Sequence, residues 1–90
     1  MALDVHEYEC GKMGRLLFQI DDKTYSNLQS AIELFQQRTG LFLDPYRDVV
    51  MDTALPALIS ALREAQTSPS LLGILAECER MGRSVIFVGD

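Results

Sequence analysis

Apolar side chains recur at helical spacing between residues 21 and 40, at Tyr25, Leu28, Ile32 and Phe35. Asp21 or Asp22 is suited to cap the N-terminus of this helix, where a carboxylate also complements the helix dipole. Gly40 is expected to end the helix, because glycine adopts the left-handed cap conformation at little cost. The pattern therefore predicts one amphipathic helix with Phe35 in the core.

Two more helices are predicted in the second half of the chain. Asp52 or Thr53 is expected to cap the first of them, whose opening turn tolerates Pro56. Its apolar stripe consists of Leu55, Leu58, Ile59 and Leu62. Ser68 followed by Pro69 is a typical start signal for the second. That helix is expected to end at Gly82.

Strands are expected on either side of the helices. In residues 16–20, Leu16, Phe18 and Ile20 alternate and are predicted to point inward. Residues 2–9 alternate only partly, and a hairpin across residues 10–14 would join the two segments. The continuous apolar run Val85–Val88 is typical of a central strand buried on both faces, so Ile86 should be buried.

These elements predict an α+β fold in a single domain spanning residues 1–90. We expect a small antiparallel or mixed sheet packed against three helices, with residues 16–20 and 85–88 in the sheet. A chain of 90 residues, 48% of them hydrophobic, is sufficient for one modest core.

Between the first and second helices lies the segment that is most informative about function. Residues 41–43 are apolar and are expected to run toward the core, and Pro45 fixes a turn. The candidate protein-binding residues lie in this turn: Asp44, Tyr46, Arg47 and Asp48. Tyrosine and arginine are favoured anchors of protein interfaces, and Tyr46 is expected to be half exposed. A purely structural interpretation has equal weight: Asp44 caps the turn, Arg47 pairs with an acid, and Tyr46 covers the edge of the core.

The net charge is −5, and residues 1–52 hold nine of the thirteen acidic residues. This acidity disfavours nucleic acid as a partner and is compatible with a basic protein. No apolar run approaches the length of a membrane span, and the N-terminus does not have the pattern of a signal peptide, so we expect a cytoplasmic protein. Cys10 and Cys78 lack metal-ligand spacing and are expected to be free thiols, with Cys78 buried on a helix face.

The residue pattern does not predict an enzyme, a metal site or a cofactor. His6 is the chain's only histidine and lies in a strand-like segment, so no Ser/His/Asp set is expected. Gly11 and Gly14 lack the lysine-serine ending of a phosphate loop. The segment from Asp44 to Asp48 offers too few oxygen ligands for Ca²⁺.

A set of short motifs resembles small bacterial immunity proteins. These motifs are Ile20-Asp21, Tyr25, Ala31, Phe35, Thr39-Gly40, Asp44-Pro45-Tyr46, Gly82 and Ile86-Phe87-Val88-Gly89-Asp90. Proteins of this kind are encoded beside secreted polymorphic toxins and neutralise them by binding. Arg47 departs from the pattern, in which a smaller residue follows Asp-Pro-Tyr.

The resemblance implies a cytoplasmic, non-enzymatic inhibitor that occludes the active or substrate site of a cognate toxin. The acidic front half would suit a toxin with a basic active site. The alternative is an interaction or regulatory module unrelated to toxins. Such a module could form a homodimer through a sheet edge. A small enzyme or ligand-binding domain is a third interpretation.

Overall fold

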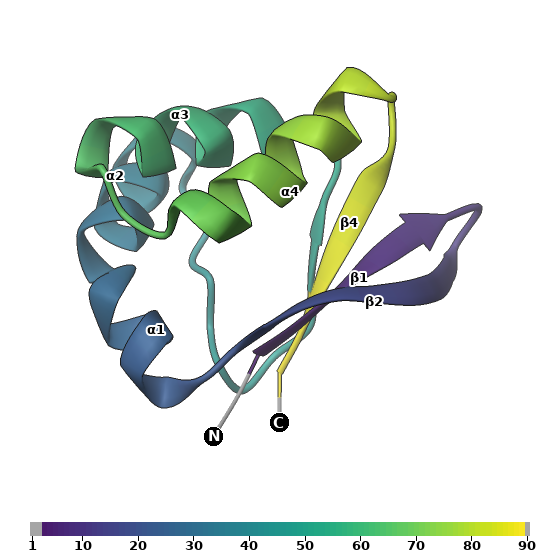
Figure 1. Cartoon of the computed structure of the whole chain (residues 1–90), viewed down its shortest axis with the longest axis horizontal. Helices are drawn as coiled ribbons and strands as arrows, with labels where there is room; N and C mark the ends of the chain where they lie inside the picture. Colours follow the sequence, from purple (N-terminus) through teal and green to yellow (C-terminus); the bar gives the residue numbers. More distant parts are fainter. Residues whose placement is uncertain (1–2, 90) are drawn as a thin grey trace.

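The computed structural model describes residues 3–89, which form a four-stranded sheet and four helices (Figure 1). The predicted α+β class, with a sheet packed against helices, is confirmed, and every strand pair is antiparallel. In chain order the elements are β1 (Leu3–Glu9), β2 (Lys12–Ile20), α1 (Asp22–Asn27), α2 (Gln29–Thr39), β3 (Val49–Met51), α3 (Leu55–Ala65), α4 (Pro69–Arg80) and β4 (Ser84–Val88).

The strand order is β2-β1-β4-β3, so β4 is a central strand as predicted. The two strands assigned to the sheet from sequence, residues 16–20 and 85–88, are not neighbours, because β1 lies between them. Val5 of β1 lies opposite Phe87 of β4, and Val49 of β3 lies opposite the same residue on the other side. The short strand β3 was not predicted, since three residues are too few for an alternating pattern.

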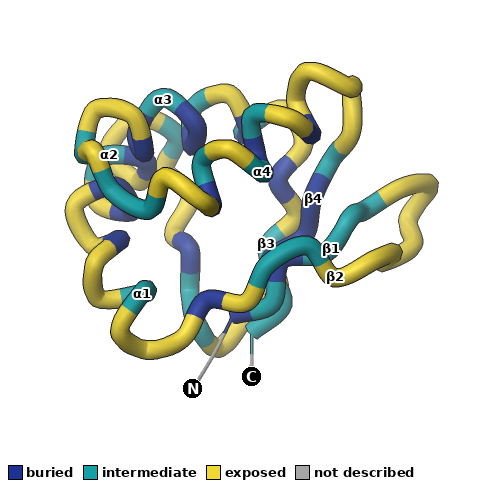
Figure 2. Tube along the Cα trace, viewed as in Figure 1, coloured by how far each residue is buried: buried dark blue, intermediate teal, exposed yellow. Residues whose placement is uncertain are grey.

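The helices cover one face of the sheet and leave the other face open (Figures 1 and 2). Val5, Val85 and Phe87 point toward the helices and are fully buried, as is Phe35 on α2. The buried side chains form one contiguous cluster that joins the sheet to α2, α3 and α4. Ile86 is 9% exposed, which confirms its predicted burial, although it lies on the opposite face of β4 from this cluster.

A β-bulge in β2 changes which of its side chains point inward. Val5 lies opposite Phe18 and His6 opposite Leu16, so Leu17 is an extra residue between the two pairs. Phe18 and Leu17 both pack against the core, whereas Leu16 is 44% exposed. The prediction that Leu16 points inward was therefore wrong, because strict alternation cannot allow for an inserted residue.

The first predicted helix is divided at Leu28 into α1 and α2, but both of its ends lie where they were expected. The Asp21 carboxylate accepts a hydrogen bond from the Thr24 N–H at 2.7 Å, which holds the pKa of Asp21 below its usual value. Gly40 ends α2 with φ of 77°.

The start of α3 differs from the prediction. Neither Asp52 nor Thr53 caps this helix; it begins at Leu55 with Ala54 in the cap position. The Asp52 carboxylate accepts a hydrogen bond from the Ser84 hydroxyl at 3.0 Å, so it ties β3 to β4 instead. A contact between residues that are 32 positions apart in the sequence has overridden a local capping preference.

Cys10 is exposed in the hairpin turn, and Cys78 is buried on α4; both are free thiols. We predict that a thiol reagent will modify Cys10 quickly in the folded protein and Cys78 only when the protein unfolds. Burial raises the pKa of the Cys78 thiol and so reduces its reactive thiolate fraction. Ellman titration of wild type and Cys10→Ser measures the two rates separately. Rapid modification of Cys10→Ser under native conditions would contradict the prediction.

A second prediction tests the core. Phe35→Ala should lower the free energy of unfolding by roughly 3–5 kcal/mol, because the ring is fully buried. Phe42→Ala is the matched control: the Phe42 ring is 45% exposed, so its loss should cost about 1 kcal/mol or less. Urea melts of both variants give the comparison, and similar losses would mean that α2 does not pack as described.

Candidate functional site

The turn at residues 44–48 is closed by its own backbone and by one side chain. The Asp44 carbonyl accepts a hydrogen bond from the Arg47 N–H at 3.3 Å, and the Asp44 carboxylate accepts one from the Tyr46 N–H at 2.8 Å. Aspartate in the first position and Pro45 in the second are the residues that favour such a turn. The prediction that Pro45 fixes a turn here is confirmed.

The chain before the turn is anchored to α1. The Tyr25 hydroxyl donates a hydrogen bond to the Leu43 carbonyl at 2.8 Å. Burial raises the pKa of Tyr25, so this donor keeps its proton at neutral pH. Of the three apolar residues expected in the core, only Leu43 is buried; Leu41 and Phe42 are 41% and 45% exposed. In an extended connection Phe42 points away from the side on which Leu43 is buried, which accounts for the exposure of Phe42.

The chain after β4 anchors the other side of the turn. The Gly89 N–H donates a hydrogen bond to the Asp48 carboxylate at 3.2 Å. A Cβ atom at position 89 would lie 2.4 Å from the Arg47 nitrogen and 2.7 Å from the Pro45 carbonyl oxygen. Only glycine permits this close backbone approach. The turn is therefore held by its own residues, by α1 and by the end of β4.

The two remaining candidate side chains project from this anchored backbone. Tyr46 is 62% exposed, somewhat more than expected, and the Arg47 side chain is 82% exposed. Arg47 Nε lies 3.8 Å from an Asp44 carboxylate oxygen, and an ion pair this exposed is worth about 1 kcal/mol or less. Beside Tyr46 lies a shallow cavity of about 300 Å³, lined by Leu3, Ile20, Asp22, Tyr25, Ser26, Pro45 and Tyr46.

The four candidate residues thus divide into two roles. Asp44 holds the backbone of the turn through a hydrogen bond, as the structural interpretation proposed, and Asp48 holds the chain end at Gly89, a role that was not predicted. Tyr46 and Arg47 present an aromatic ring and a guanidinium group to solvent on a fixed frame. Sequence reasoning did not assign a role to Gly89, because its contact with residue 48 spans 41 positions.

The described residues, 3–89, hold neither a metal-binding cluster nor a membrane-spanning helix. No group of three or more His, Cys, Asp or Glu side chains in this part of the chain is arranged to hold a metal ion. None of the helices that the structure describes has the length and hydrophobicity needed to cross a bilayer. Comparisons with protein families, curated proteins and solved structures gave no match.

A third prediction tests the anchoring of the turn. Gly89→Ala should push the chain end away from Arg47, and hydrogen exchange at the amides of residues 46 and 89 should become faster. Gly73→Ala is the control, because a Cβ there meets nothing within 4 Å; it should raise stability by about 0.5–1 kcal/mol. Unchanged exchange in Gly89→Ala would mean that this contact does not restrain the turn.

Proposed function

We propose that this chain is an immunity protein, which binds a cognate bacterial toxin and neutralises it by occluding the toxin's active or substrate site. The observation that carries the proposal is the combination of a restrained turn with exposed Tyr46 and Arg47 side chains. Preorganised loops lose little conformational entropy on binding, so contacts made through them translate efficiently into affinity.

In this proposal Tyr46 is the central anchor and Arg47 contributes hydrogen bonds at its side. Tyrosine and arginine are enriched among interface residues that contribute most to affinity, which supports these roles. Asp44 and Asp48 act by holding the turn in its binding conformation. The shallow cavity beside Tyr46 would accept a small apolar side chain of the toxin.

The charge of the chain supports a basic partner. The net charge is −5, and Asp22, Asp44 and Asp48 are all in or beside the turn. Toxins that act on nucleic acids or nucleotides usually have basic active sites, and an acidic inhibitor would associate with them rapidly. The resemblance to small bacterial immunity proteins points in the same direction, with the cytoplasm as the place of action.

The open face of the sheet favours a second candidate, an interaction or regulatory module that forms a homodimer. Val50, Ile86, His6 and Leu16 lie in one row across the four strands on this face. Val50 and Leu16 are 41% and 44% exposed, and β2 and β3 are edge strands. Edge strands and half-exposed apolar residues are common features of self-association.

A fourth prediction tests the proposed function. In cells that express the toxin encoded beside this gene, co-expression of this chain should restore growth. Tyr46→Ala should weaken binding of the toxin by about 2 kcal/mol or more. Arg47→Ala should also weaken binding, whereas Arg63→Ala, which removes an exposed arginine from α3, should not. Calorimetric titration measures affinity, and thermal melts should be almost unchanged for all three variants.

Asp44 and Asp48 are unsuitable for this test, because replacing either would disturb the turn itself. If Tyr46→Ala and Arg47→Ala bind the toxin as tightly as Arg63→Ala, the interface does not include the turn. If the neighbouring protein does not bind and the purified chain elutes as a stable dimer, the second candidate replaces the first.

A further inference from the structure

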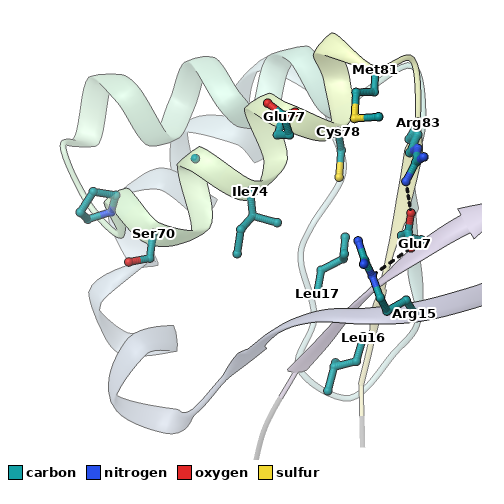
Figure 3. A pocket seen from close by; sticks show the side chains of 12 residues that line it. Glu7, Arg15, Leu16, Leu17, Ser70, Ile74, Glu77, Cys78, Met81 and Arg83 are labelled. Carbon is teal, nitrogen blue, oxygen red and sulfur yellow. Dashed lines mark hydrogen bonds and ion pairs between the residues drawn. The ribbon is translucent and has the colours of Figure 1, made fainter.

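A groove of about 650 Å³ lies between α4 and the β1–β2 hairpin, away from the turn at residues 44–48 (Figure 3). Its apolar lining includes Leu17 from β2, Ile74 and Cys78 from α4, and Met81, which directly follows α4. Met81 is 51% exposed, although methionine is an apolar residue. The volume and the apolar lining are those of sites that take small molecules.

Two features of the sequence keep the groove open. The bulge at Leu17 bends β2, and the far end of the hairpin diverges from the helices (Figure 1). Gly73 lies on the α4 wall, and a Cβ there would meet nothing within 4 Å. Glycine weakens a helix interior, so a larger residue would stabilise α4 while narrowing the groove.

The polar end of the groove has an excess of positive charge. Glu7 accepts from Arg83 Nη1 at 2.5 Å and from Arg15 Nε at 3.3 Å, so two guanidinium groups share one carboxylate (Figure 3). Glu77 also lines the groove, but it pairs with Arg80 on the same helix, which holds the pKa of Glu77 below its usual value. Arg80 lies outside the lining and balances Glu77, so the excess of +1 belongs to the group of Glu7, Arg15 and Arg83.

This local charge is opposite in sign to the net charge of −5 of the whole chain. Each guanidinium group has five N–H donors, and Glu7 takes only some of them. The Arg15 side chain is 73% exposed and the Arg83 side chain 47% exposed, so both can reach a ligand. This arrangement matches a ligand with an anionic head, which the arginines would bind, and an apolar tail, which would lie along the lining.

We propose that the groove binds a small amphipathic acid, with its carboxylate on Arg15 and Arg83 and its apolar tail along Leu17, Ile74 and Met81. This site is separate from the proposed toxin contact and does not depend on it. The ligand gains a charge-assisted hydrogen bond at one end and burial of methylene groups at the other.

The fifth prediction uses dodecanoate as the probe, below its micelle-forming concentration. It should shift the NMR methyl signals of Leu17, Ile74 and Met81. Dodecyltrimethylammonium has the same tail and the opposite charge, and butanoate has the same head and a short tail; both should bind at least about tenfold more weakly. Equal binding of the cationic and anionic probes would overturn the proposal, as would shifts confined to Val50 and Ile86 on the open face of the sheet, neither of which lines the groove.

Variants separate the head from the tail. Arg15→Gln with Arg83→Gln should weaken dodecanoate binding at least about tenfold, the loss expected for one charge-assisted hydrogen bond. Lys23→Gln with Arg63→Gln removes the same charge elsewhere and should leave the affinity unchanged. An unaltered affinity in the first pair would overturn the proposal.

Gly73→Leu provides an independent test that leaves the charges in place. Its side chain should occupy the tail site and abolish binding of dodecanoate, while α4 remains folded. Binding that survives this change would overturn the proposal. Two further results would overturn the proposal. The first is a shift of the groove's NMR signals when the protein is diluted without ligand, which would indicate that a second copy of the chain occupies the groove. The second is an acidic peptide that binds in the groove when dodecanoate does not.

Discussion

The pairing of β4 with β1 on one side and β3 on the other is the constraint on which the rest of the structure depends. Val85 and Phe87 are fully buried against the helices, which fixes the register of the strand, since a slip of one residue would turn both away from the core. Both functional candidates are attached to the ends of this strand. Gly89 meets the turn at one end, and Arg83 meets Glu7 at the other.

The two candidate sites use exposure in different ways. At the turn, hydrogen bonds restrain the backbone while Tyr46 and Arg47 are left to solvent, which suits contact with a large partner. At the groove, the apolar lining is recessed between a helix and a bent strand, which suits a ligand that can enter it. In each case a rigid element positions the side chains, so their binding geometry is largely set before the partner arrives.

Local features of the fold could be predicted from sequence, and features that depend on distant contacts could not. The Asp21 cap, the Gly40 stop and the Pro45 turn each follow from neighbouring residues, and all three were predicted. The inward direction of Leu16 was predicted wrongly because a bulge is not visible in a short alternating pattern.

The same limit applies to the candidate sites. The composition of the turn made Tyr46 and Arg47 candidates, and both are exposed as a binding role requires. The contact between Gly89 and Asp48 depends on strand order, which could not be predicted from the sequence. Arg83 and Glu7 are 76 positions apart, so no local motif could indicate that they share the groove.

The distance between the two ends of β4 determines whether the sites would influence each other. Six residue steps of extended chain separate Arg83 from Gly89, a span of about 20 Å at the usual rise per residue. Charges are screened within about 8 Å at physiological ionic strength, so an acid in the groove would have little direct effect on a partner at the turn. Energetic coupling between them would require β4 to have two discrete arrangements. The burial of its three central residues and its pairing on both sides favour a single arrangement, and on this basis the two binding events would be independent.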